Sequence, residues 1–138
     1  MSKTQTKARE SQGYAWSQPT CCDPPEKLAR EILARGPKQV VLTLGGRGAL
    51  IVTEFSETHV PSVDVPVVDT TGAGDAFNAG LAVALANGSD VESAVRFTVI
   101  AGALAVTKEG VTPSLPYRDD VLASFNRNGF ALPQWFRT

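Results

Sequence analysis

The sequence has little that would mark a disulfide-rich, metal-binding or nucleic-acid-binding protein. Its only two cysteines, Cys21 and Cys22, are adjacent. A disulfide framework needs separated cysteines and a zinc site needs spaced ligands. The 13 Lys and Arg residues against 14 Asp and Glu give a net charge of −1, so no basic excess is present to neutralise a phosphate backbone. We therefore expect no nucleic-acid partner and no oxidising compartment.

Long hydrophobic runs are also missing. The charge-free stretches 76–89 and 97–107 fall short of the roughly 20 apolar residues that a membrane-spanning helix needs. The N-terminus lacks the continuous apolar core of a secretory signal. What remains is an ordinary globular composition over 138 residues, 43% hydrophobic and 20% charged, enough for one domain. These features predict a soluble, cytoplasmic protein with no membrane partner.

The chain divides into three parts by composition. Residues 1–22 are polar and without periodicity, which is typical of a flexible lead-in. Asp23 followed by Pro24 and Pro25 predicts a capped helix start, so we expect a structured region over 23–128 and a C-terminal tail over 129–138.

Within that region, apolar spacing and turn residues predict the elements in turn. Gln39–Leu44 is nearly all apolar, as in a strand of a parallel sheet buried on both faces. Ser89-Asp90-Val91-Glu92 has the form of a capping box. The predicted order is a helix over 25–35, the strand 39–44, a hairpin of 49–53 with 58–60, an edge strand at best over 63–68, helices from 74–75 to 86 and from 89 to 107, a loop marked by Pro113 and Pro116, and a helix over 119–126. This order predicts an α/β layered fold.

The run Asp69-Thr-Thr-Gly72-Ala73-Gly74-Asp75 is the segment most suited to chemistry, because it stands where a strand gives way to a helix. Glycines there bring backbone N–H groups close to a ligand, and the first helical turn adds unpaired donors and the positive end of the helix dipole. The segment therefore predicts an anion site suited to phosphate.

Three phosphate-loop interpretations compete. A Walker-A loop needs Lys and then Ser or Thr where Asp75 and Ala76 stand, and a dinucleotide fingerprint needs a glycine where Phe77 stands. In the third, Asp75 is a general base that takes a proton from a hydroxyl, while the N–H groups stabilise the transferring phosphoryl group. A simple alternative stays open beside it, in which Asp75 is only a helix N-cap and the glycines form a tight turn.

Thr43-Leu44-Gly45-Gly46-Arg47-Gly48 is a second glycine cluster after a strand. It would let nucleotide phosphates or ribose approach the backbone, although a hairpin turn with a surface arginine explains it as well. The single histidine, His59, fits a solvent-facing strand position better than a catalytic one.

These motifs resemble a known family. Asp69–Leu85, DTTGAGDAFNAGLAVAL, resembles the C-terminal signature of the ribokinase-like carbohydrate kinases, the phosphofructokinase-B family. Val41–Ile51 is similar to that family's nucleotide loop, and Ala103–Pro116 is similar to the ribokinase branch. The resemblance, over about 24–126, implies a three-layer α/β/α ribokinase-like fold, of which this chain would hold the C-terminal half only.

The resemblance also implies roles for individual residues. Asp75 matches the catalytic base that contacts the sugar's primary hydroxyl, and the amides of Gly72, Ala73 and Gly74 match the anion hole. The nucleotide loop matches Thr43, Leu44, Gly45, Gly46, Arg47 and Gly48, together with Gly74 and Asp75. The implied potassium site matches Asp69, Thr71, Ala105, Lys108, Gly110 and Ser114.

The implied activity is transfer of the γ-phosphoryl group of ATP, with Mg²⁺ and K⁺, to the primary hydroxyl of a sugar such as ribose. The family's N-terminal sugar-binding residues and its Asn-x-x-Glu element have no counterpart here, and Val99 stands where a residue near the adenine is usually polar. We therefore expect a truncated kinase that is inactive alone. The alternative is a non-catalytic nucleotide- or anion-binding fragment. Expected partners are sugar and ATP, with a second copy or a complementary N-terminal half.

Overall fold

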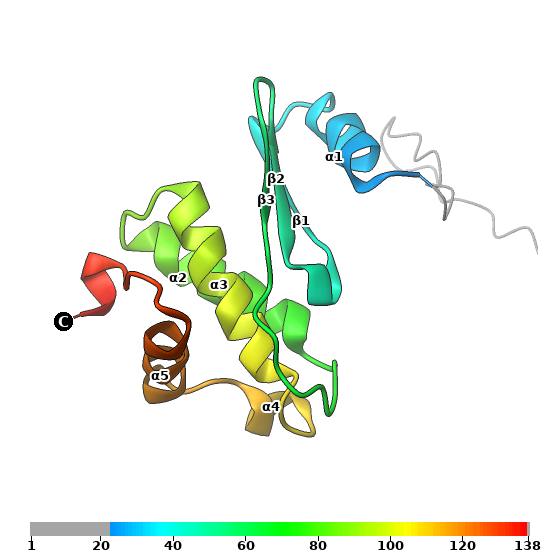
Figure 1. Cartoon of the computed structure of the whole chain (residues 1–138). Coiled ribbons are helices and arrows are strands. Elements are labelled where there is room, and N and C mark those ends of the chain that lie inside the picture. The colour runs from blue at the N-terminus through cyan, green and yellow to red at the C-terminus, as the bar shows by residue number, and fades with distance from the viewer. Residues whose placement is uncertain (1–22, 138) are drawn as a thin grey trace, which may run out of the picture.

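The computed structural model describes residues 23–137, and the predicted lead-in 1–22 lies outside this range. In these residues a three-stranded sheet lies between one helix on one face and a helix pair on the other (Figure 1). The strands β1 (Gln39–Thr43), β2 (Ala49–Thr53) and β3 (Glu57–Val60) follow one another in the sheet. The helices are α1 (Pro25–Leu33), α2 (Ala73–Ala86), α3 (Val91–Ala105), α4 (Val111–Ser114) and α5 (Arg118–Asn128), with short 3-10 turns at Gly45–Arg47 and Gln134–Phe136.

Alternation along the strands sends apolar side chains to both faces of the sheet. Leu50 and Val52 pack with Ala29 of α1 and Val40 of β1. On the other face Ala49, Ile51 and Val60 pack against side chains of α2 and α3, which are Phe77, Val95 and Val99. The predicted three-layer α/β/α arrangement is thus confirmed.

The expectation of a parallel strand at 39–44 is wrong. β1 pairs antiparallel with β2, with Val41 opposite Ile51, and β2 pairs antiparallel with β3, with Leu50 opposite His59. The apolar run of β1 comes from the two covered faces: Val41 packs with one core cluster and Leu42 with the other. Such a run indicates burial on both sides, and it does not specify the direction of the neighbouring strand.

Several predicted boundaries shift by a residue or more. α1 begins with Pro24 at its N-cap, while Asp23 forms an ion pair with Lys27 at 2.8 Å. The N-cap of α3 is Asp90, which accepts from the Ser93 amide and hydroxyl, so the capping box beginning at Ser89 is wrong. No strand forms over 63–68, and the expected loop contains α4.

The helix pair α2 and α3 packs closely, because small residues line the contact. A Cβ on Gly80 would lie 2.7 Å from the Oγ1 of Thr98, which is fully buried and donates a hydrogen bond to the carbonyl of Phe77. This contact ties the first half of α2 to the middle of α3.

The C-terminal tail packs onto α3 and α5. The ring of Phe97 lies 5.1 Å from that of Trp135 and 5.2 Å from that of Phe136, both edge-on. The indole of Trp135 donates to the hydroxyl of Ser89 at 2.8 Å, so the tail is anchored to the body. No helix in the described part of the chain is long and apolar enough to cross a bilayer.

Candidate functional site: a cleft between two glycine turns

The turn before α2 is held by the carboxylate of Asp69. Its Oδ1 accepts from the amide of Thr71 at 2.9 Å and from the Thr71 hydroxyl at 2.7 Å, and its Oδ2 accepts from the amide of Gly110 at 3.0 Å. The Thr71 hydroxyl, followed by the two amides, lowers the pKa of Asp69 below its usual value. Asp69 therefore joins the start of α2 to the segment before α4.

Gly72 is the N-cap of α2 and takes a left-handed conformation with φ of 83°. This excludes the alternative in which Asp75 is the N-cap, since Asp75 is the third residue of the helix. The Ala73 amide donates to the Thr70 carbonyl at a long 3.3 Å. The amides of Gly72, Gly74 and Asp75 have no acceptor among residues 23–137. The α2 N-terminus thus presents free N–H donors and its positive dipole end, as an anion site requires.

The side chain of Asp75 is exposed, and it makes no hydrogen bond or ion pair within the described chain. A carboxylate in the first turn of a helix is favoured by the helix dipole. It is free to accept a proton from an incoming hydroxyl that approaches the free amides.

The second glycine cluster forms a tight turn between β1 and β2. The Leu44 amide donates to the Gly48 carbonyl at 2.7 Å, and the Gly48 amide donates to the Gly45 carbonyl at 3.0 Å. A Cβ on Gly48 would overlap the carbonyl oxygen of Val60 and lie 2.7 Å from the amide of Ser62, and its φ of 94° also favours glycine. The hairpin-turn interpretation of this cluster is correct, and the turn also lines a cleft.

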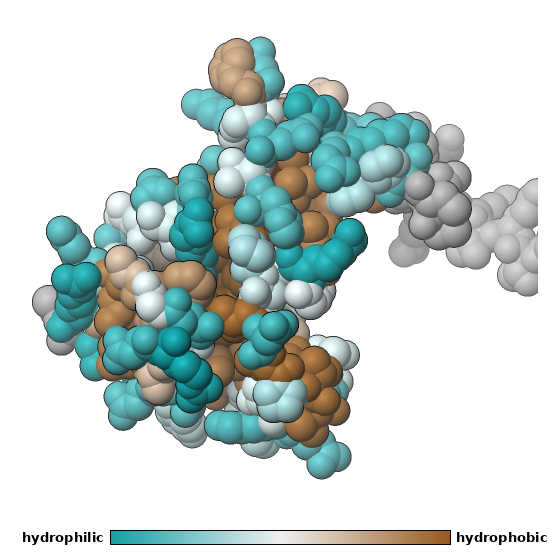
Figure 2. Space-filling view, in the orientation of Figure 1, coloured by the Kyte–Doolittle hydropathy of each residue, from teal (hydrophilic) through white to brown (hydrophobic). Residues whose placement is uncertain are grey.

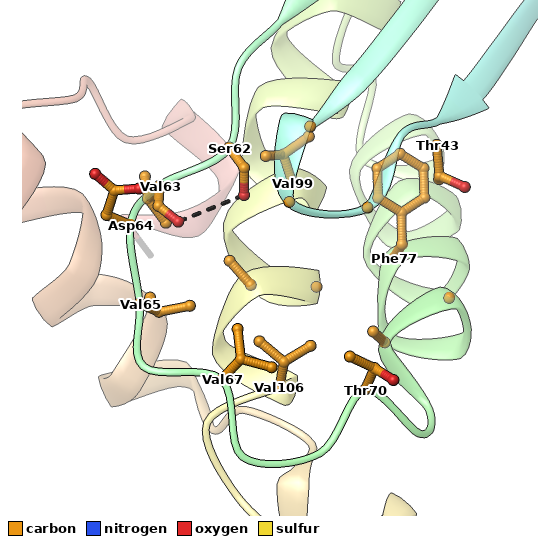
Figure 3. A pocket seen from close by; sticks show the side chains of 17 residues that line it. Thr43, Ser62, Val63, Asp64, Val65, Val67, Thr70, Phe77, Val99 and Val106 are labelled. Atoms are coloured by element: carbon orange, nitrogen blue, oxygen red, sulfur yellow. Dashed lines mark hydrogen bonds between the residues drawn. The ribbon is translucent and has the colours of Figure 1, made fainter. Parts of the chain in front are cut away.

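Both turns border the same cleft, which has a volume of about 420 Å³ (Figure 3). Thr43, Gly45, Gly46 and Gly48 line it from one turn, and Ala73 and Gly74 line it from the other. The predicted site residues Leu44, Arg47, Gly72 and Asp75 are not among its lining residues. Two motifs separated in sequence by β2 and β3 are thereby brought to one site.

Two walls of the cleft were not expected from the sequence. The segment 62–67 contributes Ser62, Val63, Asp64, Val65 and Val67, and Figure 3 shows it passing opposite Phe77 and Thr70. Val99, Gly102, Ala103 and Val106 form the α3 side. Of these residues only Val99 is expected near the nucleotide from the sequence resemblance. The cleft is largely apolar, and the only charged side chain among its lining residues in the described chain is Asp64.

The residues of the implied potassium site come from the turn before α2, the end of α3 and the segment around α4. Asp69, Thr71 and Gly110 share the hydrogen bonds described above, Ala105 is the last residue of α3, and the buried hydroxyl of Ser114 donates to the carbonyl of Val111 at 2.8 Å. The side chain of Lys108 forms an ion pair with Asp120, with an Nζ to Oδ2 distance of 3.9 Å. It lines a second cavity of about 120 Å³, together with Ser114 and Arg127.

A hard cation near Asp69 would have to be bound mainly by backbone carbonyl oxygens. Asp69 accepts three hydrogen bonds of the roughly four that a carboxylate can take, so little of its capacity is left for an ion. Among residues 23–137 no group of three or more His, Cys, Asp or Glu side chains could hold a metal. Asp69 acts first as an organiser of the turn.

The fold and the cleft define an α/β protein with free amides at the N-terminus of a helix, and comparison with known proteins makes this class specific. Residues 14–118 match the pfkB family carbohydrate kinase domain. The chain belongs to the pfkB family of carbohydrate kinases, with a ribokinase-like fold.

Individual relatives agree with this assignment. The chain is 43% identical over 97 residues to the ribokinase of Bacillus subtilis, covering 70% of this chain and 33% of that protein. It superimposes on the crystal structure of the ribokinase of Thermotoga maritima with a TM-score of 0.71 and 42% identity, covering 73% of this chain and 34% of the other. For the Arabidopsis thaliana ribokinase complexed with ribose and ATP, the TM-score is 0.65 and the identity 35%, covering 70% and 32%. The chain spans about a third of the length of these relatives.

Proposed function

We propose that this chain supplies the nucleotide-binding and phosphoryl-transfer part of an ATP-dependent sugar kinase of ribokinase type. The observation that carries the proposal is the cleft that the Gly45–Gly48 turn and the start of α2 line together, the latter through Ala73 and through Gly74 with its free amide. The solved structure of the Arabidopsis ribokinase contains ribose and ATP, which supports a sugar and ATP as the substrates here.

The two turns divide the binding of ATP between them. The Gly45–Gly48 turn offers an open backbone to the ribose and phosphates, since a Cβ on Gly45 or Gly46 would meet nothing within 4 Å. The apolar walls at Val65 and Val99 suit a flat base. The α2 amides then lie where negative charge develops on the transferring phosphoryl group, and such fixed donors stabilise that charge without reorganising.

Asp75 is the general base in this proposal. A primary hydroxyl oxygen of the sugar forms a bond to the γ-phosphorus, the bond from that phosphorus to the β,γ-bridging oxygen breaks, and ADP leaves. The proton of the hydroxyl passes to the Asp75 carboxylate. Asp75 fits this role because it is exposed, unbonded and only one residue beyond the free amide of Gly74.

Relatives of known structure contain ATP with Mg²⁺, in a putative ribokinase II of Escherichia coli, and potassium, in the phosphofructokinase-2 of the same organism. Bound here, Mg²⁺ would neutralise phosphate charge and K⁺ would order the α2 turn. For K⁺ the carbonyls around Asp69 and Gly110 are the fitting donors, with Asp69 holding the two segments together. In the described chain no acidic cluster is available for Mg²⁺, so its contacts would be to phosphates and water.

The proposal includes a partner for the apolar surface beside the turn. Exposed apolar side chains gather there, namely Val67, Val68, Val111, Leu115 and Tyr117. Figure 2 shows the corresponding apolar surface at the end of the molecule that α4 occupies in Figure 1. Such an exposed apolar patch supports association with a complementary part of the fold or with a second copy.

The test is release of ADP by the purified chain with Mg-ATP, K⁺ and a panel of sugars including D-ribose. We expect Asp75→Asn to lower any sugar-dependent turnover by about 10²–10⁴-fold, because the amide keeps the shape but cannot accept the proton. Binding of Mg-ADP should be nearly unchanged. Asp119→Asn is the matched control, since Asp119 is an exposed carboxylate in the first turn of another helix, α5, and does not line the cleft.

The outcomes separate the two functions. Binding of Mg-ADP without any ADP release would favour the non-catalytic nucleotide-binding fragment. Absence of nucleotide binding would overturn the proposal for this chain while leaving its family membership unaffected. Equal turnover of the Asp75→Asn variant and the wild type would overturn the assignment of the base.

A further inference from the structure

The side chain of His59 reaches from β3 to the Gly45–Gly48 turn. Its Nε2 lies 2.7 Å from the carbonyl oxygen of Arg47. His59 stands opposite Leu50 in the β2–β3 register, so its side chain leaves the sheet on the face that packs against α1, beside the end of the turn. This bond connects two segments that are 12 residues apart.

The hydrogen bond of His59 restrains the peptide group between Arg47 and Gly48. The carbonyl of Arg47 and the amide of Gly48 belong to the same planar peptide and point in opposite directions. The Gly48 amide donates inward to the Gly45 carbonyl at 3.0 Å, while the Arg47 carbonyl accepts outward from His59. Rotation of this peptide would break both hydrogen bonds at once.

Gly48 is the residue through which such a rotation would occur. Its φ of 94° and ψ of −129° belong to a region open chiefly to glycine, and glycine is also the residue with the most conformational freedom. The turn therefore has, at a point where it borders the cleft, a glycine whose backbone no side chain of its own restrains. A side-chain bond to the preceding carbonyl limits that freedom.

We propose that His59 is a positioning residue: its imidazole N–H holds the Arg47–Gly48 peptide and so keeps the Gly45–Gly48 turn in the shape that receives a nucleotide. The assignment of the ligand rests on the proposed function, whereas the effect on the turn does not. His59 takes no part in the chemical step, because its hydrogen bond is to the backbone of the turn and it is not among the residues that line the cleft.

The experiment compares His59→Leu, which removes the donor, with His59→Gln, whose side-chain amide reaches about as far as the imidazole Nε2 and still donates. Glu57→Leu is the matched control. Glu57 lies on the same strand and face, and its only partner in the described chain is Arg30 of α1, at 2.7 Å, away from the turn. Two quantities are measured on the full chain: hydrogen exchange of the Gly48 amide by NMR without nucleotide, and the Kd for Mg-ADP by calorimetry.

His59→Leu should speed exchange of the Gly48 amide by about two- to tenfold, the factor that corresponds to one net hydrogen bond, and raise the Kd for Mg-ADP similarly. His59→Gln should restore both values, and Glu57→Leu should change neither. Unchanged Gly48 exchange in His59→Leu would overturn the proposal, as would a failure of His59→Gln to restore it or an equal effect of Glu57→Leu. Faster exchange with an unchanged Kd would overturn the positioning role.

The result also separates this proposal from the function on which its ligand rests. If the wild-type chain binds no Mg-ADP, the proposed function fails, and the exchange of Gly48 in the three variants still decides whether His59 holds the turn.

Discussion

Replacing Gly72 by alanine tests the turn at the start of α2 in two independent ways. Gly72 has a φ of 83°, and a Cβ there would lie 2.9 Å from the Cγ1 of Val111 and 3.4 Å from its Cα. The left-handed conformation costs about 1–2 kcal/mol for a residue with a Cβ. The Val111 side chain is 40% exposed and can give way in part, so displacing it adds only about 1 kcal/mol, the low end of the cost of overpacking. We expect Gly72→Ala to lower the free energy of unfolding by about 2–3 kcal/mol.

The chain offers a matched control at the other end of the same helix. Gly88 has a φ of 82°, but a Cβ there would meet nothing within 4 Å. Gly88→Ala should therefore cost only the backbone part, about 1–2 kcal/mol. Urea denaturation of both variants gives the difference, which isolates the contact with Val111. Adding Val111→Ala should recover part of the loss in Gly72→Ala and none of it in Gly88→Ala.

Equal losses in the two glycine variants would refute the argument that Val111 restricts the turn. Binding of Mg-ADP adds a functional result. Because Gly72→Ala displaces the turn that presents the free amides, its affinity for Mg-ADP should fall, whereas Gly88→Ala should bind like the wild type. Unchanged affinity in Gly72→Ala, together with the expected destabilisation, would show that the nucleotide does not depend on this turn.

Two further substitutions test the charge of Asp69 in the turn before α2 and the packing of Phe97 in its aromatic cluster. The pKa of Asp69 is lowered by the Thr71 hydroxyl first and by the amides of Thr71 and Gly110 next. The charged Asp69 carboxylate therefore stabilises the fold fully when the pH is above the ordinary pKa of 3.8, and this stabilisation is lost as the pH falls through the lower pKa of the folded state. At pH 7 Asp69→Asn should thus have a lower free energy of unfolding than the wild type, and in acid the two values should converge. Urea denaturation at both pH values measures this difference, and an equal difference at both would exclude a role for the charge. Phe97→Ala should lower the free energy of unfolding by about 3–5 kcal/mol, because its ring is 5% exposed within an aromatic cluster. Phe55→Ala is the control, because the Phe55 ring is 90% exposed, and it should change the free energy of unfolding little. Similar losses of stability in the two variants would contradict the packing argument.

The helices and the hairpin could be predicted closely because their signals are local. Apolar spacing and stop residues placed α1, α2 and α5 within a few residues of their observed ends. The direction of β1 could not be predicted, because an apolar run records only that both faces are covered. The N-cap of α3 was displaced by one residue since Ser89 and Asp90 can both cap, and Asp90 accepts from both the amide and the hydroxyl of Ser93.

Part of the candidate site could likewise be predicted from the sequence, and part could not. The two glycine turns were recognisable from residue types that suit phosphate, and the structure places both at one cleft. The wall formed by 62–67 had no signal beyond an apolar run interrupted by Pro66, because irregular chain takes its shape from distant contacts. Here the amides of Val68 and Asp69 donate to the carbonyl of Val106, at 2.8 and 3.2 Å. Such a contact between the end of α3 and the approach to α2 is not written in either segment alone.

The shape of the cleft thus depends on contacts to the backbone, and we therefore expect nucleotide binding and the proposed proton transfer to be separable by substitution. His59 holds the carbonyl of Arg47, and Asp69 holds the amide of Gly110. Asp75 is exposed and contributes no bond to this framework within the described chain. A change at Asp75 should therefore alter the proposed proton acceptor and leave the framework intact, whereas a change at Gly72 should alter the framework itself. Loss of turnover with retained Mg-ADP affinity is accordingly the expected signature of Asp75→Asn, and loss of both is that of Gly72→Ala.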